Sequence, residues 1–388
     1  MASVLDLFTR LDEEDVLTFH SNMMKTLTIS KNTRFLNYDI SFLNDFYKDE
    51  KPVGDLLPYS EICNFCDDIK NNRKPRVKVK LDPKDFMLKS WSSAIANGLV
   101  QIGSQERMGT GTIYKDDTII RLSNVTIDET GAVTLHCQKA KYSDQVKSNL
   151  IVDFTSKKFT EADSLRNILR GNDGQKLPTL SDKRMANTLG VACILFYWDN
   201  EYWTPVMIPR PPESLKAVSV FEGGWHCSAS GAAEWPAVTE REFFEAISDD
   251  MLREIHEELG IEKNEVHDFD LVSICREFAR AGKPQLFFTG FVNLDFKTLM
   301  MRIDKARATA SLSGNKIETL KYPIFRSNPS NAEFFQEIQT RDDVEINAKK
   351  TIRPGITTEG ATALYYAAQV LKIRKRTSQS EPYKLDLM

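Results

Sequence analysis

The sequence predicts an α/β (α+β) protein in which a mixed sheet is sandwiched by helices, preceded by a separate α+β domain. Segments with strand-like alternation recur along the chain, and helical periodicities separate them. The 388 residues suffice for two or three domains of about 100–200 residues. A change of composition at 172–184 (NDGQKLPTLSDKR) gives the boundary, with an N-terminal domain at 1–180 and a second domain at 181–388.

The N-terminal domain is expected to be helical at first and then rich in strands. Helical periodicity predicts helices at 12–27, after an aspartate cap, and at 59–72 (YSEICNFCDDIKNN). Strict alternation in KPRVKVKL predicts a strand at 74–81, and β-branched runs separated by turn residues predict strands within 107–153. A helix at 161–175, ended by GNDG, completes this part.

The second domain alternates strands and helices, which favours a mixed sheet covered by helices. The expected elements, in chain order, are a hairpin at 190–210, a glycine-punctuated extended segment at 219–235, a long helix at 239–259, a hairpin at 269–294 that turns at RAGKP, a helix at 296–308, a strand at 317–326, and helices at 330–339 and 359–373.

Composition and charge exclude several classes of protein. A net charge of −4 gives no electrostatic case for binding nucleic acid or a membrane. The first residues are acidic where a signal peptide needs an apolar run, and no run of about 18 apolar residues occurs, so we expect a cytoplasmic protein. Of the six cysteines, only Cys63 and Cys66 have a metal-like spacing, and without a second ligand pair they are expected in the core.

The stretch REIHEELGI, 253–261, places three glutamates within five residues of the long predicted helix. Glu254 and Glu258 project within the apolar arc of this helix and Glu257 lies at its edge, where ionised carboxylates need compensating cations. Mg²⁺ is such a cation, and Gly260 is suited to end the helix. An exposed acidic helix is the alternative. The arc consists of Phe244, Ile247, Met251, Ile255 and Leu259.

The order Arg-Glu-apolar-any-Glu-Glu-any-Gly-apolar resembles the signature of the Nudix hydrolases, and the resemblance extends over about 188–325. That signature has a further glutamate eight residues before the arginine, where Glu245 stands. It has a glycine six residues earlier still, where this chain has Thr239. If Gly231 is the equivalent glycine, Glu234 is an alternative to Glu245 as the upstream glutamate of the signature.

The resemblance implies a Nudix-type fold and a Mg²⁺-dependent (or Mn²⁺-dependent) pyrophosphohydrolase. Its substrate would be a small molecule in which a nucleoside diphosphate is linked to another moiety: a nucleotide, an ADP-ribose-like group or a sugar. Glu257 and Glu258 would then be metal ligands, and Glu254 a ligand or the base that deprotonates the attacking water. Arg253 would orient the glutamates, and Glu318 would complete the metal site together with the upstream glutamate. Nudix hydrolases are often homodimers.

Substrate-binding residues are expected at strand ends near this helix. Arg210, Arg276 and Lys283 would hold phosphates, with ordinary surface charge as the alternative. Trp225 and Phe278 would stack on a base, although aromatic residues in strands are more often core residues.

Two other functions compete with hydrolysis. A Nudix-fold sensor that binds nucleotides without turnover would explain the Thr239 departure and the long N-terminal segment. An interaction scaffold is the third class. The adjacent His226 and Cys227 suggest an isomerase of the same fold, but the spacing around WHCSAS does not resemble that of the isomerases.

Overall fold

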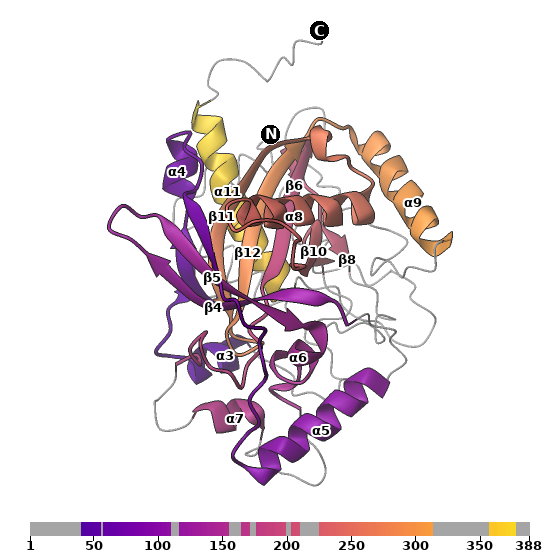
Figure 1. Ribbon diagram of the computed structural model, residues 1–388. Helices are drawn as coiled ribbons and strands as arrows, with labels where there is room; N and C mark the ends of the chain where they lie inside the picture. Colours follow the sequence, from indigo (N-terminus) through magenta and orange to yellow (C-terminus); the bar gives the residue numbers. More distant parts are fainter. Residues whose placement is uncertain are drawn as a thin grey trace.

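The centre of the fold is a seven-stranded mixed sheet (Figure 1). A computed structural model of the chain describes residues 40–55, 57–109, 116–154, 164–170, 176–198, 203–209, 225–312 and 357–377. The strand order is β1-β2-β11-β12-β6-β10, and β7 pairs with β6 beside this path. The strands are β1 (Pro52–Val53), β2 (Leu57–Asn64), β6 (Gly190–Trp198), β7 (Trp203–Pro205), β10 (Ala229–Ala232), β11 (Val266–Glu277) and β12 (Lys283–Val292).

The strand β12 is the middle of this sheet and is buried along its whole length. It forms the predicted antiparallel hairpin with β11 and pairs in parallel with β6 on its other side. A strand that is covered on both faces is apolar throughout, which explains the continuous run LFFTGFV. The predicted hairpins at 190–210 and 269–294 are confirmed by the β6–β7 and β11–β12 pairs.

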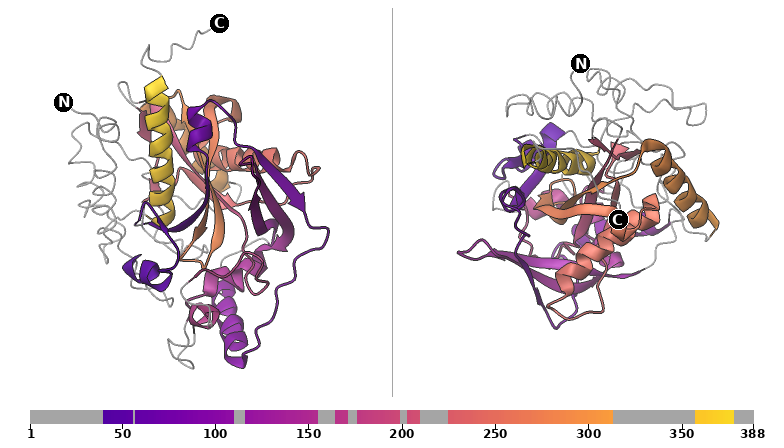
Figure 2. Two further views of the ribbon diagram at one scale, coloured as in Figure 1. Left: turned by 90° about the vertical axis from the view of Figure 1, so that its left-hand side faces the viewer. Right: turned by 90° about the horizontal axis from the view of Figure 1, so that it is seen from above.

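Helices cover both faces of the sheet, and the predicted α/β class is confirmed (Figure 2). On one face, α8 (Phe243–Leu259) packs on β6 and β10, and α9 (Phe296–Leu312) packs on α8. On the other face, α11 (Thr358–Thr377) packs on β12, β6 and β2, beside α4 (Cys66–Lys70). Alternate residues of β6 belong to the two resulting cores, because successive side chains of a strand point to opposite faces.

A second, three-stranded sheet lies over α8, in the order β3-β5-β4. Its strands are β3 (Val77–Leu81), β4 (Thr118–Ile127) and β5 (Val133–Lys141), as the alternation and turn residues predict. Backbone hydrogen bonds join it to the main sheet, from Leu189 N to Ile120 O (2.7 Å) and from Ile120 N to Ala233 O (2.9 Å). The helix α8 is therefore enclosed between two sheets.

Helices of the N-terminal part surround the tip of the β11–β12 hairpin, which is consequently buried. The side chain of Arg166 makes the central contact: its guanidinium pairs with Asp153 and donates to the carbonyls of Phe278 and Ala279 at the tip. The helices are α3 (Ile40–Phe46), α5 (Ala94–Gly109), α6 (Tyr142–Val146), η1 (Asn149–Ile151) and α7 (Leu165–Arg170).

The boundary predicted at residue 180 runs through a shared sheet, not between two separately packed units. The strand β2 comes from the N-terminal side, and it is hydrogen-bonded to β11 from the C-terminal side, from Ser273 opposite Asn64 to Glu277 opposite Tyr59. The hairpin tip is likewise packed among N-terminal helices. A division at 180 would leave both parts with uncovered apolar surface.

One predicted helix is wrong. Residues 59–72 form most of β2 and the short α4, because pairing with β11 outweighs the local helical periodicity. Cys63 is buried and Cys66 half-buried, as expected for core cysteines. The predicted helices at 239–259, 296–308 and 359–373 are confirmed by α8, α9 and α11, and the described part of the helix predicted at 161–175 is confirmed by α7.

Three predicted elements, at 12–27, 317–326 and 330–339, lie outside the described residues. Within the part of the chain that the structure describes, no helix combines the length and the apolar character needed to cross a bilayer.

Candidate functional site

The helix α8 carries the candidate site, and packing fixes its position. Its buried residues are Phe243, Ile247, Met251, Leu252, Ile255 and Leu259. The helix ends at Gly260, whose φ of 67° is left-handed. A Cβ at this position would also lie 2.7 Å from the carbonyl oxygen of Arg302 in α9. Glycine is therefore required here both by the backbone and by the neighbouring helix.

Glu254 faces the sheet and is mostly buried, with 18 % of its side chain exposed. It lies against Gly231 of β10, where a Cβ would come within 3.1 Å of the carboxyl Cδ and Oε1. Burial raises the pKa of Glu254 to about 7, and the nearby Asp250 and Glu257 add to the rise, while Arg253 opposes it. This carboxyl group therefore changes its protonation state near neutral pH.

The guanidinium of Arg253 gathers the acidic side chains of the site. Its Nη1 donates to Glu257 Oε1 (2.7 Å), and its Nη2 donates to Glu254 Oε1 (2.9 Å) and Asp250 Oδ1 (2.7 Å). Glu234, which follows β10, lies 3.4 Å away. Charge-assisted bonds of this kind fix the planar group and the carboxylates relative to one another.

The structure brings Glu234, not Glu245, to the arginine. Glu245 lies nine residues before Glu254 on the same helix, which places it half a turn round at 100° per residue, and its side chain is exposed. The spacing along the sequence suggested Glu245, whereas the carboxylate comes from the end of β10. Glu234 also donates its backbone N–H to Asp250 Oδ2 (3.1 Å).

Asp250 is a member of the site that the sequence reasoning missed. It stands three residues before Arg253 and four before Glu254, so it shares a helix face with both. Glu258 is four residues after Glu254 on the same side and is half-buried, whereas Glu257 is 56 % exposed. The helical spacing of acidic residues around 253 was the signal that could have identified Asp250.

The side chains around Arg253 are of the chemical type that a hard divalent cation prefers, although no three of their carboxylate groups meet closely enough among the described residues to form a ready-made metal site. Among the described residues, four carboxylates contact one guanidinium, so the ionised cluster has a net charge of −4 + 1 = −3. Carboxylate oxygens are the ligands that Mg²⁺ and Mn²⁺ prefer. Burial is the largest cause of the raised pKa of Glu254, and the negative charges of Asp250 and Glu257 add to it. A divalent cation would compensate the net negative charge of the cluster.

The stability of the metal-free protein should depend on this carboxyl group. Its folded-state pKa of about 7 exceeds the value of about 4.3 for an unfolded chain, so the contribution is full below about pH 4 and is lost as the pH rises through 7. We expect Glu254→Gln to be more stable than the parent by up to about 3 kcal/mol at pH 8, with the difference disappearing near pH 4. Urea unfolding of both proteins across this range measures it, and a difference independent of pH would contradict it.

The residues predicted to bind substrate lie in several different places. Arg210, Glu318 and the side chain of Trp225 lie outside the described residues. Arg276 is half-buried and donates to the carbonyl of Gly282 (3.2 Å), and it also contacts the carbonyl of Pro178, so it holds the hairpin turn. Phe278 packs in the core.

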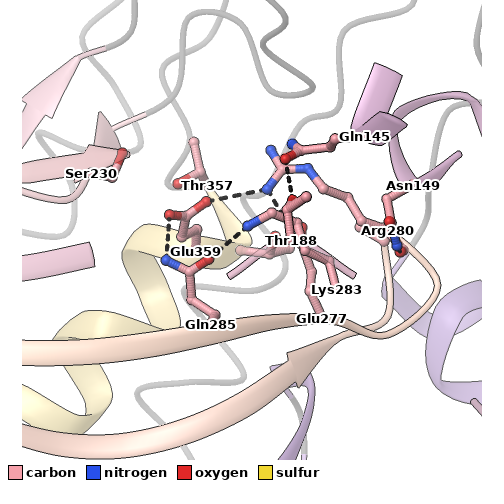
Figure 3. A network of polar contacts seen from close by, with 12 residues as sticks. Gln145, Asn149, Thr188, Ser230, Glu277, Arg280, Lys283, Gln285, Thr357 and Glu359 are labelled. Carbon is pink, nitrogen blue, oxygen red and sulfur yellow. Dashed lines mark hydrogen bonds and ion pairs between the residues drawn. The ribbon is translucent and has the colours of Figure 1, made fainter. Parts of the chain in front are cut away.

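Lys283 belongs to a buried polar network on the α11 face of the sheet, and Figure 3 shows its members pointing toward one another. Lys283 Nζ donates to Gln285 Oε1 (3.2 Å), and Gln285 Nε2 donates to Glu359 Oε1 (3.2 Å). Arg280 pairs with Glu277 (3.0 Å) and lies 3.6 Å from Glu359. Burial lowers the pKa of Lys283 to about 8. This lysine is therefore a buried group rather than a surface cation.

Two polar clusters thus lie on opposite faces of one sheet, the carboxylates around Arg253 beneath α8 and the buried network beside α11. The chain matches no protein-family model, and no curated protein shows significant sequence similarity to it.

Proposed function

We propose that this protein is a hydrolase that requires Mg²⁺ or Mn²⁺ and cleaves the diphosphate bond of a nucleoside diphosphate linked to another moiety. The observation that carries the proposal is the convergence of Glu234, Asp250, Glu254 and Glu257 on Arg253. The resemblance of REIHEELGI to the Nudix signature supports the same reaction class.

Glu254 is suited to act as the general base. A base is most effective when its pKa lies near the working pH, and burial holds the pKa of Glu254 at about 7. Its carboxyl group is fixed by Gly231 on one side and by the Arg253 guanidinium on the other. Glu254 would accept the proton of the water that attacks phosphorus.

Glu257 and Glu258 would hold the cation, with Glu254 and Glu234 beside them. The planar guanidinium of Arg253 donates hydrogen bonds to both Glu254 and Glu257. These bonds would hold the two carboxylates together when the diphosphate binds. A bound divalent cation neutralises the charge that develops on the leaving phosphate. The scaffold is rigid, because α8 is enclosed between two sheets and a site on regular elements keeps its geometry.

The experiment is a turnover assay of the full chain with Mg²⁺ or Mn²⁺ on ADP-ribose, dinucleotides, nucleoside triphosphates and nucleotide sugars. We expect cation-dependent release of phosphorylated products from at least one class. Thermal stabilisation by a compound without release would favour a nucleotide sensor and reject the hydrolase. Neither release nor stabilisation from any compound, with the protein folded, would reject both.

A further inference from the structure

A buried histidine, cysteine and glutamate meet where β9 (Trp225–His226) approaches the start of α11. The ligand atoms of His226, Cys227 and Glu359 all lie within 4.8 Å of one another, and all three residues are buried. His226 Nε2 is 3.9 Å from Glu359 Oε1. None of these side chains takes part in the carboxylate cluster of α8.

We propose that His226, Cys227 and Glu359 form a second metal site, for Zn²⁺ or a similar transition-metal ion. Zinc bonds of about 2.0–2.3 Å in a tetrahedron place neighbouring ligand atoms about 3.3–3.8 Å apart. The three ligand atoms would therefore move inward by about 1 Å or less. One imidazole, one thiolate and one carboxylate suit zinc, whereas Mg²⁺ takes oxygen ligands.

The imidazole is already oriented as a ligand. Its Nδ1 lies 2.6 Å from Thr357 Oγ1, which also accepts a hydrogen bond from the backbone N–H of Gly360 (2.9 Å). With Nδ1–H donated to Thr357, the lone pair on Nε2 is directed toward Glu359 and Ser230 (3.0 Å). A hydrogen bond from the second ring nitrogen is the usual means of fixing a metal-binding histidine.

An independent observation points to a ligand in the same place. The hydroxyl of Tyr59 is fully buried and has no hydrogen-bond partner within the described residues. Glu359 and Cys227 are among its electrostatic neighbours, together with Glu277 and Arg280, so it lies near this cluster. Thr358 Oγ1 and Glu277 Oε1 are also buried without a hydrogen-bond partner among the residues that the structure describes. Unpaired buried polar atoms cost stability, and several of them together are explained by a bound ion and its remaining ligands.

The neighbouring cations do not prevent metal binding. Arg280 is paired with Glu277 (3.0 Å), and its contact with Glu359 is to Oε2, whereas Oε1 is the oxygen near His226. Lys283 Nζ is hydrogen-bonded to Gln285 Oε1 (3.2 Å).

The two metal sites are separate, because they lie on opposite faces of β10. Gly231 pairs with Val191 and lies against Glu254, on the α8 side. Ser230 pairs with Ala192, on the α11 side, and its hydroxyl lies 3.0 Å from His226. The site beneath α8 takes a hard cation, and the site beside α11 takes a borderline one.

Cobalt substitution in the full chain tests the proposal. Metal-free protein is prepared with a chelator and titrated with Co²⁺. We expect one equivalent to give a near-ultraviolet sulfur-to-cobalt charge-transfer band and the intense visible bands of a tetrahedral site, both abolished by added Zn²⁺. A wild-type protein without the sulfur-to-cobalt band overturns the proposal, whatever the variants do.

Variants assign the band to these residues. Cys227→Ser should abolish it and weaken Zn²⁺ binding by at least about 100-fold, whereas Cys193→Ser, at a buried thiol of β6, should retain both. Thr357→Val should weaken Zn²⁺ binding by about 10–100-fold, because it frees the imidazole ring. A band that survives Cys227→Ser, or that Cys193→Ser removes, overturns the assignment.

Glu254→Gln separates this proposal from the proposed function. The band should persist in this variant even where hydrolysis is lost. If Glu254→Gln removes the bound Co²⁺ and Cys227→Ser does not, the ion occupies the carboxylate cluster of α8 and the second site is rejected. If Glu359→Gln also leaves the affinity for Zn²⁺ unchanged, the carboxylate has no part in the site and the proposal fails.

Discussion

Replacing Glu254 with glutamine is expected to lower kcat for diphosphate hydrolysis by about 10²–10⁴-fold. Glutamine retains the size of the side chain and can still accept a hydrogen bond from Arg253, but it cannot take a proton from water. The acid limb of the parent's pH profile should report the same group, with a midpoint at or below about 7, because a bound cation lowers the pKa of a neighbouring carboxyl. Steady-state kinetics across pH 5–9, an assay range of about four units, measure both effects.

Asp249→Asn is the matched control for this variant. Asp249 is a carboxylate of the same helix, but it is half exposed and pairs with Lys263 (2.6 Å) rather than with Arg253. Its replacement should leave kcat within about twofold, because surface ion pairs contribute little. Equal rates for the parent and Glu254→Gln would remove Glu254 from the mechanism.

Replacing Arg166 with methionine should lower the free energy of unfolding by about 3–5 kcal/mol. The guanidinium of Arg166 is buried, and it donates to Asp153 (2.5 and 2.7 Å), Tyr47 (2.7 Å) and the carbonyl of Phe278 (2.7 Å). Methionine fills a similar volume but leaves Asp153 buried without a counter-charge. Urea unfolding followed by circular dichroism measures the loss.

Arg73→Met provides the comparison at an exposed ion pair. Arg73 lies 3.1 Å from Asp68 and 63 % of its side chain is exposed, so the variant should lose less than about 1 kcal/mol. Adding Asp153→Leu to Arg166→Met should restore part of the stability, since the unpaired charge is then removed. An Arg166→Met protein as stable as Arg73→Met would show that the buried pair does not hold the hairpin tip.

Local patterns were sufficient to predict most of the elements. The helix α8 follows from apolar residues at helical spacing before a left-handed glycine, and the β11–β12 hairpin follows from two apolar runs about a glycine turn. The acidic motif in α8 was predicted for the same reason, since its spacing lies within one helix.

Long-range pairing was not predictable from these patterns. Residues 59–72, which include most of β2, were expected to be a helix, because Ile62, Cys66 and Ile69 have helical spacing and nothing nearby in the sequence indicates the partner strand β11. Glu234 was an alternative only, because counting along the helix favours Glu245. The example of Glu234 shows that a site assembled from a strand end and a helix cannot be identified from the residue spacing within the helix alone.

The polar network beside α11 was missed for a related reason. RAGKP has the composition of an exposed turn. Lys283 was predicted to hold phosphate, with ordinary surface charge as the alternative, and Arg280 was not singled out. They are buried because the helices of the N-terminal part cover the turn. Glu359 is an acidic residue in the first turn of α11, and no residue close to it in the sequence indicates that His226 is its neighbour in space.

The pairing of β2 with β11, with α11 packed on β2, has a consequence for synthesis on the ribosome. The strand β2 ends at Asn64, and α11 ends at Thr377, a further 313 residues along the chain. At about 5–20 residues per second, the nascent chain exposes β2 for roughly 15–60 s before the last covering helix is translated. The side chains of β2 on the α11 side, Leu57 and Tyr59, thus lack their covering helix throughout that interval and are available to holdase chaperones, and premature termination before α11 leaves them uncovered.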